Sequence, residues 1–339
     1  MKKQCGKQSL IFTNPPGIRA WASIVGKKEG QGPLGPKFDT VEEDDYFGKN
    51  TWEEAESALQ TRLLAKVLHK AERKSEDIRY LFAGDLLGQD IATSFGVKEF
   101  QIPLFCVYGA CSTVGEALGL GAMTVAAGFA DEVVALTSSH FASAERQFRT
   151  PLEYAGQRPL SATWTVTGGG AFLLTEKSED VGITGMTTGC IVDYGVRDSM
   201  NMGAAMAPAA AALIAANLKD FGRKPEDYDR IVTGDLGAVG KRLLLELLLK
   251  QGIDISQQHE DCGMKMYDSP EQGTGSGGSG CGCAASVLAA HYLPKVQAGD
   301  LKRMLFVPTG ALLSTVSFNE GRSVPGIAHG VVIESFRKI

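Results

Sequence analysis

The sequence has no excess of basic residues. Its 339 residues include 34 Lys and Arg against 39 Asp and Glu, which gives a formal net charge of −5. Proteins that bind nucleic acid usually carry a basic face, so this balance argues against nucleic acid as a partner. No apolar run reaches 18 residues, so we expect no segment that spans a membrane alone. Attachment to a membrane would have to come through a partner.

Other common signals are also missing. The first residues lack the apolar core of a secretory signal, and the seven cysteines are odd in number and scattered, so we expect reduced thiols in an intracellular protein. The glycine-rich stretch 273–280 lacks the Gly-Lys-Ser/Thr ending of a phosphate-binding loop. Cys281 and Cys283 have neither the spacing nor the second ligand pair of a structural zinc site.

The most informative stretch covers residues 103–123. Leu104 to Tyr108 is a continuous apolar run, which predicts a strand buried on both faces, and Gly109 supplies a turn. From Ser112 onward small and apolar residues predict a closely packed helix. Cys111 therefore stands at a helix N-terminus, where free N–H groups and the helix dipole lower the pKa of a thiol. An inert buried cysteine is an equally supported interpretation, because free cysteines are often buried.

Strands and helices alternate on both sides of this stretch. In the first part we expect a long loop over 26–50, a helix over 51–73 capped by Thr51, a short helix near 89–95, and strands at 18–25, 80–83, 132–137 and 171–175. In the second part we expect helices over 206–221, 241–251 and from Cys281, and strands at 182–191, 230–233, 263–267, 304–308 and 330–334.

The two parts of the chain repeat one another. Residues 82–88 (FAGDLLG) correspond to 232–237 (VTGDLG), and Cys111 corresponds to Cys281, because each cysteine opens a small-residue helix. Such self-similarity indicates a duplication. Alternating strands and helices require crossovers and favour mostly parallel sheets. We therefore predict an α/β fold made of two halves, residues 1–180 and 181–339, stacked as a five-layer α-β-α-β-α sandwich.

This pattern resembles the thiolase fold, which is shared by thiolases, β-ketoacyl-ACP synthases and chalcone synthases. The resemblance covers nearly the whole chain. More narrowly, the sequence is similar to the stage V sporulation protein AD family of spore-forming bacteria. That similarity is carried by residues 107–123 (VYGACSTVGEALGLGAM), 137–159 (TSSHFASAERQFRTPLEYAGQRP) and 278–295 (GSGCGCAASVLAAHYLPK).

The resemblance implies that Cys111 occupies the place of the nucleophile of condensing enzymes. The synthases also carry a histidine in a His-Gln-Ala-Asn motif, but the matching strand end here reads Thr-Gly-Asp-Leu-Gly at 233–237. Their asparagine motif, Gly-Asn-Thr-Ser-Ala-Ala-Ser, is matched by 280–286, where Cys281 replaces the asparagine. Losing one oxyanion-hole donor costs about 10²–10³ in rate. We therefore expect that the chain is not an enzyme, with Asp235 near the place of the histidine.

The resemblance also implies a ligand, dipicolinic acid (pyridine-2,6-dicarboxylic acid), bound as its calcium chelate. Helix N-termini at Cys111 and Cys281 would suit a small anion. Asp235 would be a ligand for calcium or an acceptor for a protonated ring nitrogen, and otherwise caps the helix near Gly237. His259 is a candidate pocket wall, against the alternative of a solvated loop histidine. Of the three arginines in this region, Arg149 is the one that we expect to pair with a carboxylate of the ligand. The alternative is an ordinary arginine on a polar surface loop.

The family resemblance implies integral membrane proteins of the same sporulation operon as partners. It also implies a homodimer formed through the 104–107 strand, and a location peripheral to the forespore or spore inner membrane. No resident cofactor or protein-bound metal is expected. Two other functions stay open on the sequence. One is an acyl-CoA or acyl-ACP condensing or acyl-transfer enzyme that uses Cys111, and the other is a structural subunit whose pocket is vestigial.

Overall fold

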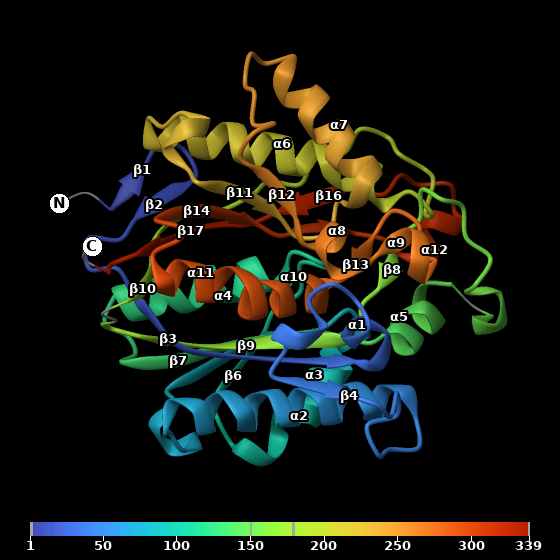
Figure 1. Cartoon of the computed structure of the whole chain (residues 1–339), viewed down its shortest axis with the longest axis horizontal. Helices are drawn as coiled ribbons and strands as arrows, with labels where there is room; N and C mark the ends of the chain where they lie inside the picture. Colours follow the sequence, from blue (N-terminus) through green and yellow to red (C-terminus); the bar gives the residue numbers. More distant parts are fainter. Residues whose placement is uncertain (1–2, 150, 178–179, 338–339) are drawn as a thin grey trace.

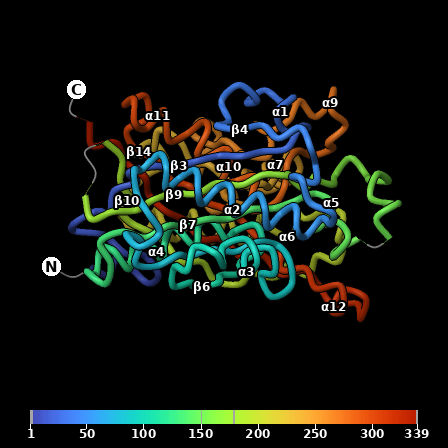
Figure 2. Tube along the Cα trace, turned by 90° about the horizontal axis from the view of Figure 1, so that it is seen from below, coloured from blue at the N-terminus to red at the C-terminus, as the bar shows by residue number. Residues whose placement is uncertain are grey.

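The structure is a computed structural model that describes residues 3–149, 151–177 and 180–337. Five layers are stacked in it, and Figure 1 shows them from top to bottom as helices, sheet, helices, sheet and helices. Both chain ends lie at one end of the long axis, and α5 (Phe141–Phe148) and α12 (Thr315–Asn319) lie at the other (Figures 1 and 2). The predicted five-layer α/β fold is confirmed.

Each half of the chain contributes five strands in the same order. The first set runs β3 (Gly17–Gly26), β9 (Gly168–Thr175), β7 (Glu132–Ser139), β5 (Tyr80–Gly84), β6 (Leu104–Cys106). The second runs β10 (Val181–Thr187), β17 (Gly330–Ser335), β14 (Arg303–Val307), β11 (Arg230–Thr233), β12 (His259–Asp261). One backbone pair, Gly17 with Gly182, joins β3 to β10. The strand order supports the predicted duplication, while the domain boundary at residue 180 stays a prediction.

The sheets are mixed and not mostly parallel, which corrects the sequence-based expectation. In each half the last two pairs are parallel, whereas β9 and β17 run antiparallel to both of their neighbours. A parallel pair needs a crossover that covers a face of the sheet. The connection from β7 to β9 holds the short α5, a 3₁₀ turn at Leu152–Tyr154 and β8 (Trp164–Thr165), and none of these is long enough to run back along the sheet, so the chain returns antiparallel.

The helices form three layers around the two sheets. The outside of the first sheet is covered by α2 (Trp52–Ala71) and α3 (Ile91–Val97). The outside of the second sheet is covered by α6 (Met202–Phe221) and α7 (Gly237–Leu249). Between the sheets lie α4 (Thr113–Ala126), α10 (Cys281–Val287), a π-helical turn (Leu288–Tyr292) and α11 (Leu293–Ala298).

Shorter elements decorate these layers. The short helices are α1 (Lys27–Gly30), α8 (Cys262–Met266) and α9 (Ser269–Gln272), with 3₁₀ turns at Gly35–Lys37, Ser75–Asp77, Gly88–Asp90, Lys98–Phe100, Leu152–Tyr154 and Pro225–Asp227. The short strands are β1 (Gln4–Cys5), β2 (Ser9–Ile11), β4 (Thr40–Glu42), β8 (Trp164–Thr165), β13 (Gly278–Ser279), β15 (Thr309–Ala311) and β16 (Gly326–Ala328).

Helix α2 begins where the sequence predicts. The Thr51 side chain accepts a hydrogen bond from the Glu54 N–H at 3.3 Å, which satisfies one of the free donors of the first turn. The predicted apolar stripe from Ala55 to Leu68 is buried against the first sheet. In the middle layer Gly115 is required for close packing, because a Cβ there would stand 2.5 Å from the His329 carbonyl oxygen.

Three local predictions are wrong. The loop predicted over 26–50 contains α1 and β4. Residues 263–266 belong to α8 and not to a strand, and Tyr267 follows the helix; the strand of this region is β12, which begins four residues earlier. The run from Leu104 is an edge strand of three residues, and Phe105 is 51% exposed, so it is not buried on both faces.

Helix α6 is long and apolar enough to cross a membrane, which the sequence analysis did not anticipate. Its mean hydropathy reaches 1.3 over an 18-residue window, and 67% of that window is buried inside the protein. It packs in the second hydrophobic core with α7. A buried core helix passes the same length and composition test, so α6 is weak evidence for a membrane span.

Candidate functional site

A strained turn carries Cys111 from β6 into α4. Ala110, directly before the cysteine, has a φ of 50°, a left-handed conformation that a non-glycine residue seldom adopts. Side-chain hydroxyls hold the turn: the Ser112 hydroxyl donates to the Gly109 carbonyl at 2.6 Å, and the Thr113 hydroxyl accepts from the Gly109 N–H at 3.1 Å. Such strain persists only where the surroundings fix it, and it is common at functional sites.

The Cys111 side chain is almost entirely buried. It is 5% exposed and packs with Leu86, Ala144 and Cys281, and Phe148 covers this cluster. Burial is the main cause that raises the pKa of Cys111 well above its ordinary value, and the nearby Asp235 carboxyl raises it further. The Gly280 N–H, which bonds the sulfur, lowers the pKa but does not offset these causes. The predicted low pKa of this thiol is therefore wrong, and the geometry agrees with the alternative of a buried, protonated cysteine.

Asp235 follows β11 and reaches across to the start of α10. Its Oδ2 accepts from the Gly280 N–H at 2.8 Å and from the Ser279 hydroxyl at 3.3 Å, and its Oδ1 accepts from the Thr309 hydroxyl at 3.2 Å. A further hydrogen bond joins it to Cys111. The side chain is fully buried, and this burial raises the pKa of Asp235 to about 7.

Asp235 does not cap the turn at Gly237, as one alternative predicted. That turn is held by Asp261 at the end of β12, which accepts from the N–H groups of Leu236 at 2.9 Å and Gly237 at 3.1 Å. Asp261 also caps α8 through the Met264 N–H. The carboxyl of Asp235 is thus left to contact Cys111 and the α10 N-terminus.

In the first half, the corresponding Asp85 has a different set of contacts. It accepts from the Leu87 N–H at 2.7 Å and from both the N–H and the hydroxyl of Thr93, at 2.8 and 2.7 Å. All three donors belong to its own turn and to α3. Asp85 is therefore a turn-holding residue, unlike its counterpart Asp235.

Cys281 lies opposite Cys111 at the first residue of α10. It is fully buried, and its thiol donates to the Ser138 carbonyl at 2.9 Å. Burial, together with neighbouring carboxyls, raises the pKa of the Cys281 thiol. The structure therefore brings Cys111, Asp235 and Cys281 together, as the sequence predicts.

His259 and Arg149 have other contacts. His259 is a buried member of β12, not a solvated loop residue, and its Nε2 lies 3.0 Å from the Thr233 hydroxyl. Burial lowers the pKa of His259 to about 3, so the ring is neutral. Arg149 is not a free surface arginine: its Nη1 pairs with both oxygens of the buried Glu145, at 2.8 and 2.7 Å. Neither contact set includes Cys111 or Asp235, and the ligand-binding roles of both residues stay predictions.

Sequence reasoning missed several residues near the cysteines. Thr309 follows β14 and bonds Asp235, and its position after a strand of the duplicated sheet was a usable signal. Asp90 has a left-handed φ of 48°, and burial and the charge of Asp85 raise its pKa to about 7. Glu56, fully buried on α2, has its pKa raised to about 8 by burial. Nothing in the sequence marks Asp90 or Glu56, because their burial depends on the tertiary fold.

The surroundings of the two cysteines are therefore acidic. Glu56, Asp85, Asp90 and Asp235 all act electrostatically on Cys281. Among residues 3–149, 151–177 and 180–337, no group of three or more His, Cys, Asp or Glu side chains is arranged to hold a metal ion. What the arrangement can do chemically is hold protons near neutral pH and accept or donate hydrogen bonds to a ligand.

A cavity of about 360 Å³ adjoins the Cys111 cluster. Tyr108, Gln147, Leu313 and Thr315 line it, and Phe148 separates it from Cys111, because the same ring also packs on the cysteine cluster. Burial is the main cause that raises the pKa of the Tyr108 phenol, and Cys111 and Cys281 contribute to the shift. Tyr108 thus stands close to both the cavity and the thiols.

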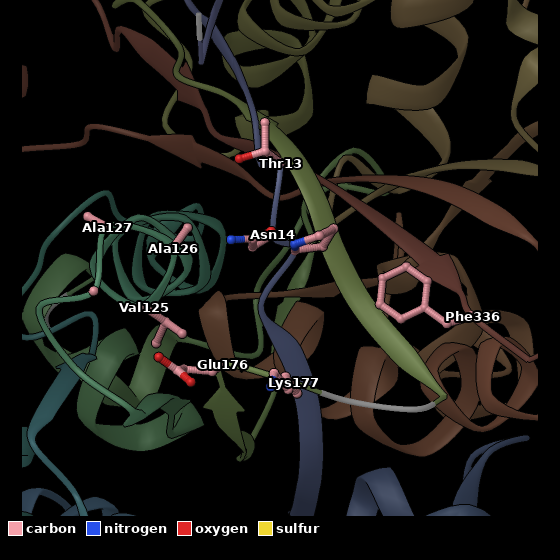
Figure 3. A pocket seen from close by; sticks show the side chains of 10 residues that line it. Thr13, Asn14, Val125, Ala126, Ala127, Glu176, Lys177 and Phe336 are labelled. Atoms are coloured by element: carbon pink, nitrogen blue, oxygen red, sulfur yellow. The ribbon is translucent and has the colours of Figure 1, made fainter. Parts of the chain in front are cut away.

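A larger cavity, of about 680 Å³, lies elsewhere. Figure 3 shows it between the 13–15 turn, the end of α4 at Val125–Gly128, the 176–177 turn and Phe336. Cys111 precedes the start of α4, and a helix of 14 residues is roughly 20 Å long, so this cavity is far from the thiol. It carries one carboxylate and one ammonium, Glu176 and Lys177, and none of the buried acids described above.

Comparison with known proteins agrees with this architecture. The profile of the family described as Stage V sporulation protein AD (SpoVAD) matches residues 6–334. The Stage V sporulation protein AD of Bacillus subtilis (strain 168) is 41% identical over 332 residues, covering 98% of both chains.

Similar solved structures include two bacterial proteins. One is the 3-oxoacyl-[acyl-carrier-protein] synthase III of Aquifex aeolicus VF5, at 13% identity and TM-score 0.57, covering 94% of this chain and 99% of the other. Another is a variant of Xanthomonas campestris OleA, at 14% identity and TM-score 0.61, covering 96% and 99%. At these identities the likeness concerns the fold alone.

Proposed function

Because the chain belongs to the stage V sporulation protein AD family, with a thiolase-like fold, we propose that it binds dipicolinic acid beside Cys111 and assists its uptake into the developing spore. The ligand is proposed to arrive as its calcium chelate. The protein is proposed to act without catalysing a reaction.

The observation that carries this proposal is the pairing of Cys111 with Asp235. An acyl-transfer nucleophile needs a thiolate, which a neighbouring imidazole or cation stabilises. Here the thiol is buried, bonded to a carboxyl, and has its pKa raised well above the ordinary value. This pairing opposes thiolate formation, whereas carboxyl and backbone N–H groups together suit the recognition of a small polar ligand.

The ligand is proposed to enter through the 360 Å³ cavity behind Phe148. Its volume falls in the range of about 300–1,000 Å³ that small-molecule sites usually occupy. Tyr108, Gln147 and Thr315 supply hydrogen-bonding groups in its wall, and rotation of Phe148 would connect the cavity to the thiol.

Charge gives calcium a role in this proposal. A pyridine dicarboxylate is a dianion, and it would approach the carboxyls of Asp90 and Asp235. Calcium carried in by the ligand, or protons held by those two carboxyls, would offset the repulsion. In the chelate, Asp235 serves as an additional oxygen ligand of calcium, whereas with metal-free ligand it accepts from a protonated ring nitrogen.

The test is a calorimetric titration of the purified chain with dipicolinate, with and without calcium. Saturable binding that weakens at least tenfold in Asp235→Asn supports the proposal, since a charge-assisted contact contributes about 1.5–3 kcal/mol. Asp193→Asn, the same change at an exposed carboxylate outside this region, is the matched control and keeps its affinity. A wild-type chain without saturable binding would overturn the proposal, as would equal affinity in wild type and Asp235→Asn.

Acyl transfer is the second candidate, and the strained Ala110 favours it. Its left-handed conformation keeps the thiol at the turn before a helix, which is the geometry of a nucleophile. Incubation with a thiol-reactive acyl donor, followed by mass analysis, separates the two functions. Acylation of Cys111 at a rate above that of Cys281, followed by transfer to malonyl-ACP, would establish the enzyme function. A structural subunit with a vestigial pocket predicts neither acylation nor ligand binding.

Two partner assignments and one location belong to the same proposal. The exposed edge strand β6, in which Phe105 is 51% exposed, is proposed to pair with its copy in a homodimer. Integral membrane proteins of the same sporulation operon are proposed to hold the chain at the forespore or spore inner membrane. Co-purification with those proteins from sporulating cells tests this location.

A further inference from the structure

A basic cavity of about 370 Å³ lies between the edge of the first sheet and the middle layer of helices. We call it the Lys37 cavity, and its main walls are Arg19, Trp21, Lys37, Asp39 and Lys70. Figure 1 shows α11 above β3, the strand of Arg19 and Trp21, on the side of the molecule that carries both chain ends. None of the residues that pack with Cys111 lines this cavity, so it is separate from the Cys111 region.

A π-helical turn borders the cavity. The turn Leu288–Tyr292 joins α10 to α11 and places the small side chains of Ala289 and Ala290 in the wall. Such turns are rare in proteins and occur frequently at functional sites. The turn belongs to the stretch 278–295, of which the region around Cys111 uses only the first residues. The rest of that stretch is therefore available for another role.

The acid in the wall is satisfied by the protein. The two carboxylate oxygens of Asp39 accept from the Lys70 ammonium at 3.0 and 3.2 Å, and Oδ2 also accepts from the Ser23 N–H at 2.9 Å. The Ser23 hydroxyl accepts from the Asp39 N–H at 3.1 Å, which fixes the two residues relative to one another. Asp39 and Lys70 thus neutralise each other, and the net charge of the wall comes from the other two cations.

These two cations, Arg19 and Lys37, lack a carboxylate of their own. The Arg19 guanidinium lies 3.6 Å from Glu132, but both oxygens of Glu132 already accept from Arg73, at 2.8 and 3.0 Å. Among the residues that the structure describes, the Lys37 ammonium pairs with no carboxylate, and its polar contact is the Nδ1 atom of His291 at 3.3 Å. The cavity therefore has a surplus of positive charge.

The ring of His291 adds a buried donor. An ammonium can only donate, so Nδ1 accepts from Lys37 and the ring carries its proton on Nε2. His291 is 9% exposed, and within the described part of the chain its buried Nε2 has no hydrogen-bond partner. Burial is the main cause that lowers the pKa of His291 to about 4, and the charges of Lys295, Lys37 and Lys265 contribute. The surroundings of Lys37 are thus rich in donors and poor in acceptors.

We propose that the Lys37 cavity binds a phosphate group, which contacts the Lys37 ammonium and the Arg19 guanidinium. An ammonium has three N–H donors and a guanidinium has five, so both side chains keep donors for a ligand beside their present contacts. A phosphate supplies several acceptor oxygens and the negative charge that the wall lacks, and a guanidinium can bind two of its oxygens at once. The proposal does not depend on the ligand assigned to the Cys111 region, and each can fail alone.

The test is a calorimetric titration of the full chain with inorganic phosphate and, separately, with glycerol 3-phosphate. Sodium chloride at about 0.1 M shortens the Debye length to about 10 Å, so exposed charges outside the wall contribute little. Saturable binding of either probe is expected, and the tighter probe tells whether the group is free or esterified. Lys37→Met should weaken the affinity at least tenfold, whereas Lys27→Met, which removes an exposed charge paired with Glu43, should leave it unchanged.

Two further variants locate the site. Trp21→Phe should remove the change in tryptophan fluorescence that phosphate causes and keep the calorimetric affinity, because Trp21 lines the cavity. Asp235→Asn should keep both signals. A wild-type chain that binds neither probe would overturn the proposal, as would equal affinity in Lys37→Met and wild type, a fluorescence change that persists in Trp21→Phe, or loss of binding in Asp235→Asn. Acetate that binds as tightly as phosphate would also overturn it, because that result would show a general attraction of anions.

Discussion

The burial of Asp235 predicts a specific dependence of stability on pH. Its pKa is raised from an ordinary 3.8 to about 7 in the folded chain, so the folded state holds a proton that the unfolded chain releases near pH 4. The free energy of unfolding is therefore highest at a pH below the pKa of Asp235 in the unfolded chain. It falls as the pH rises from that pKa to the pKa in the folded chain, and it levels off above the latter. A shift of roughly three units corresponds to about 4 kcal/mol as an order of magnitude.

Asp235→Asn isolates this contribution. The amide has nearly the shape of the protonated acid, and its oxygen can accept from the Gly280 N–H while its NH₂ group donates to the Thr309 hydroxyl. The variant should therefore gain about 4 kcal/mol relative to the wild type between about pH 4 and about pH 8. The gain arises because, as the pH rises, the buried carboxyl of the wild type stays protonated or ionises unfavourably while the unfolded chain ionises freely. The amide of the variant does not ionise in either state.

Urea unfolding of both chains at the two pH values measures this difference. Asp193→Asn is the matched control, because that exposed carboxylate has its pKa lowered by hydrogen bonds from Ser323 and Gly195, and its effect should have the opposite sign. Unfolding free energies of wild type and Asp235→Asn that follow parallel pH curves would refute the reasoning. That result would mean that Asp235 ionises in the fold as an ordinary carboxyl does.

Four further outcomes are expected. Iodoacetamide should alkylate Cys111 slowly near neutral pH and faster in Asp235→Asn, because the carboxyl helps to raise the pKa of the thiol; equal rates would contradict this cause. Phe105→Asp should yield monomers in ultracentrifugation if β6 pairs in a dimer, and an unchanged dimer would exclude this edge. Thr51→Ala should cost about 1 kcal/mol in urea unfolding through loss of the α2 cap, and an unchanged midpoint would contradict a capping role. Asp261→Ala should cost several kcal/mol, about 1–3 for each buried donor left unpaired, whereas a loss below that of Thr51→Ala would show that these donors find other partners.

Much of the fold could be predicted from the sequence because its signals are local. The Thr51 cap and the apolar stripe of α2 follow from spacing alone, and the repeated Gly-Asp turns and helix-opening cysteines indicate the duplication. The meeting of Cys111, Asp235 and Cys281 follows from that duplication, since equivalent strand and helix ends lie together in the two halves.

The remaining errors concern properties that the fold creates. A helix N-terminus next to Cys111 is visible in the sequence, but the burial that outweighs the helix dipole is not. Apolar residues at 104–108 predict a strand, but they do not distinguish a central strand from an edge strand whose side chains stay exposed. Arg149 is not a free surface arginine, because it pairs with Glu145, four residues earlier on α5, and nothing in the spacing marks Glu145 as buried.

The strand registers explain why the twin aspartates have diverged. Thr233 pairs with Asp261 between β11 and β12, and at the equivalent place in the first half Ala83 pairs with Cys106. The first half therefore has no carboxylate at this strand position, and Asp85 itself accepts from the Leu87 and Thr93 N–H groups of its turn. In the second half Asp261 supplies those hydrogen bonds, which frees Asp235 to cross to α10 and contact the thiol of Cys111. One difference at a strand end thus separates an aspartate that holds its own turn from one that contacts Cys111 and the start of α10.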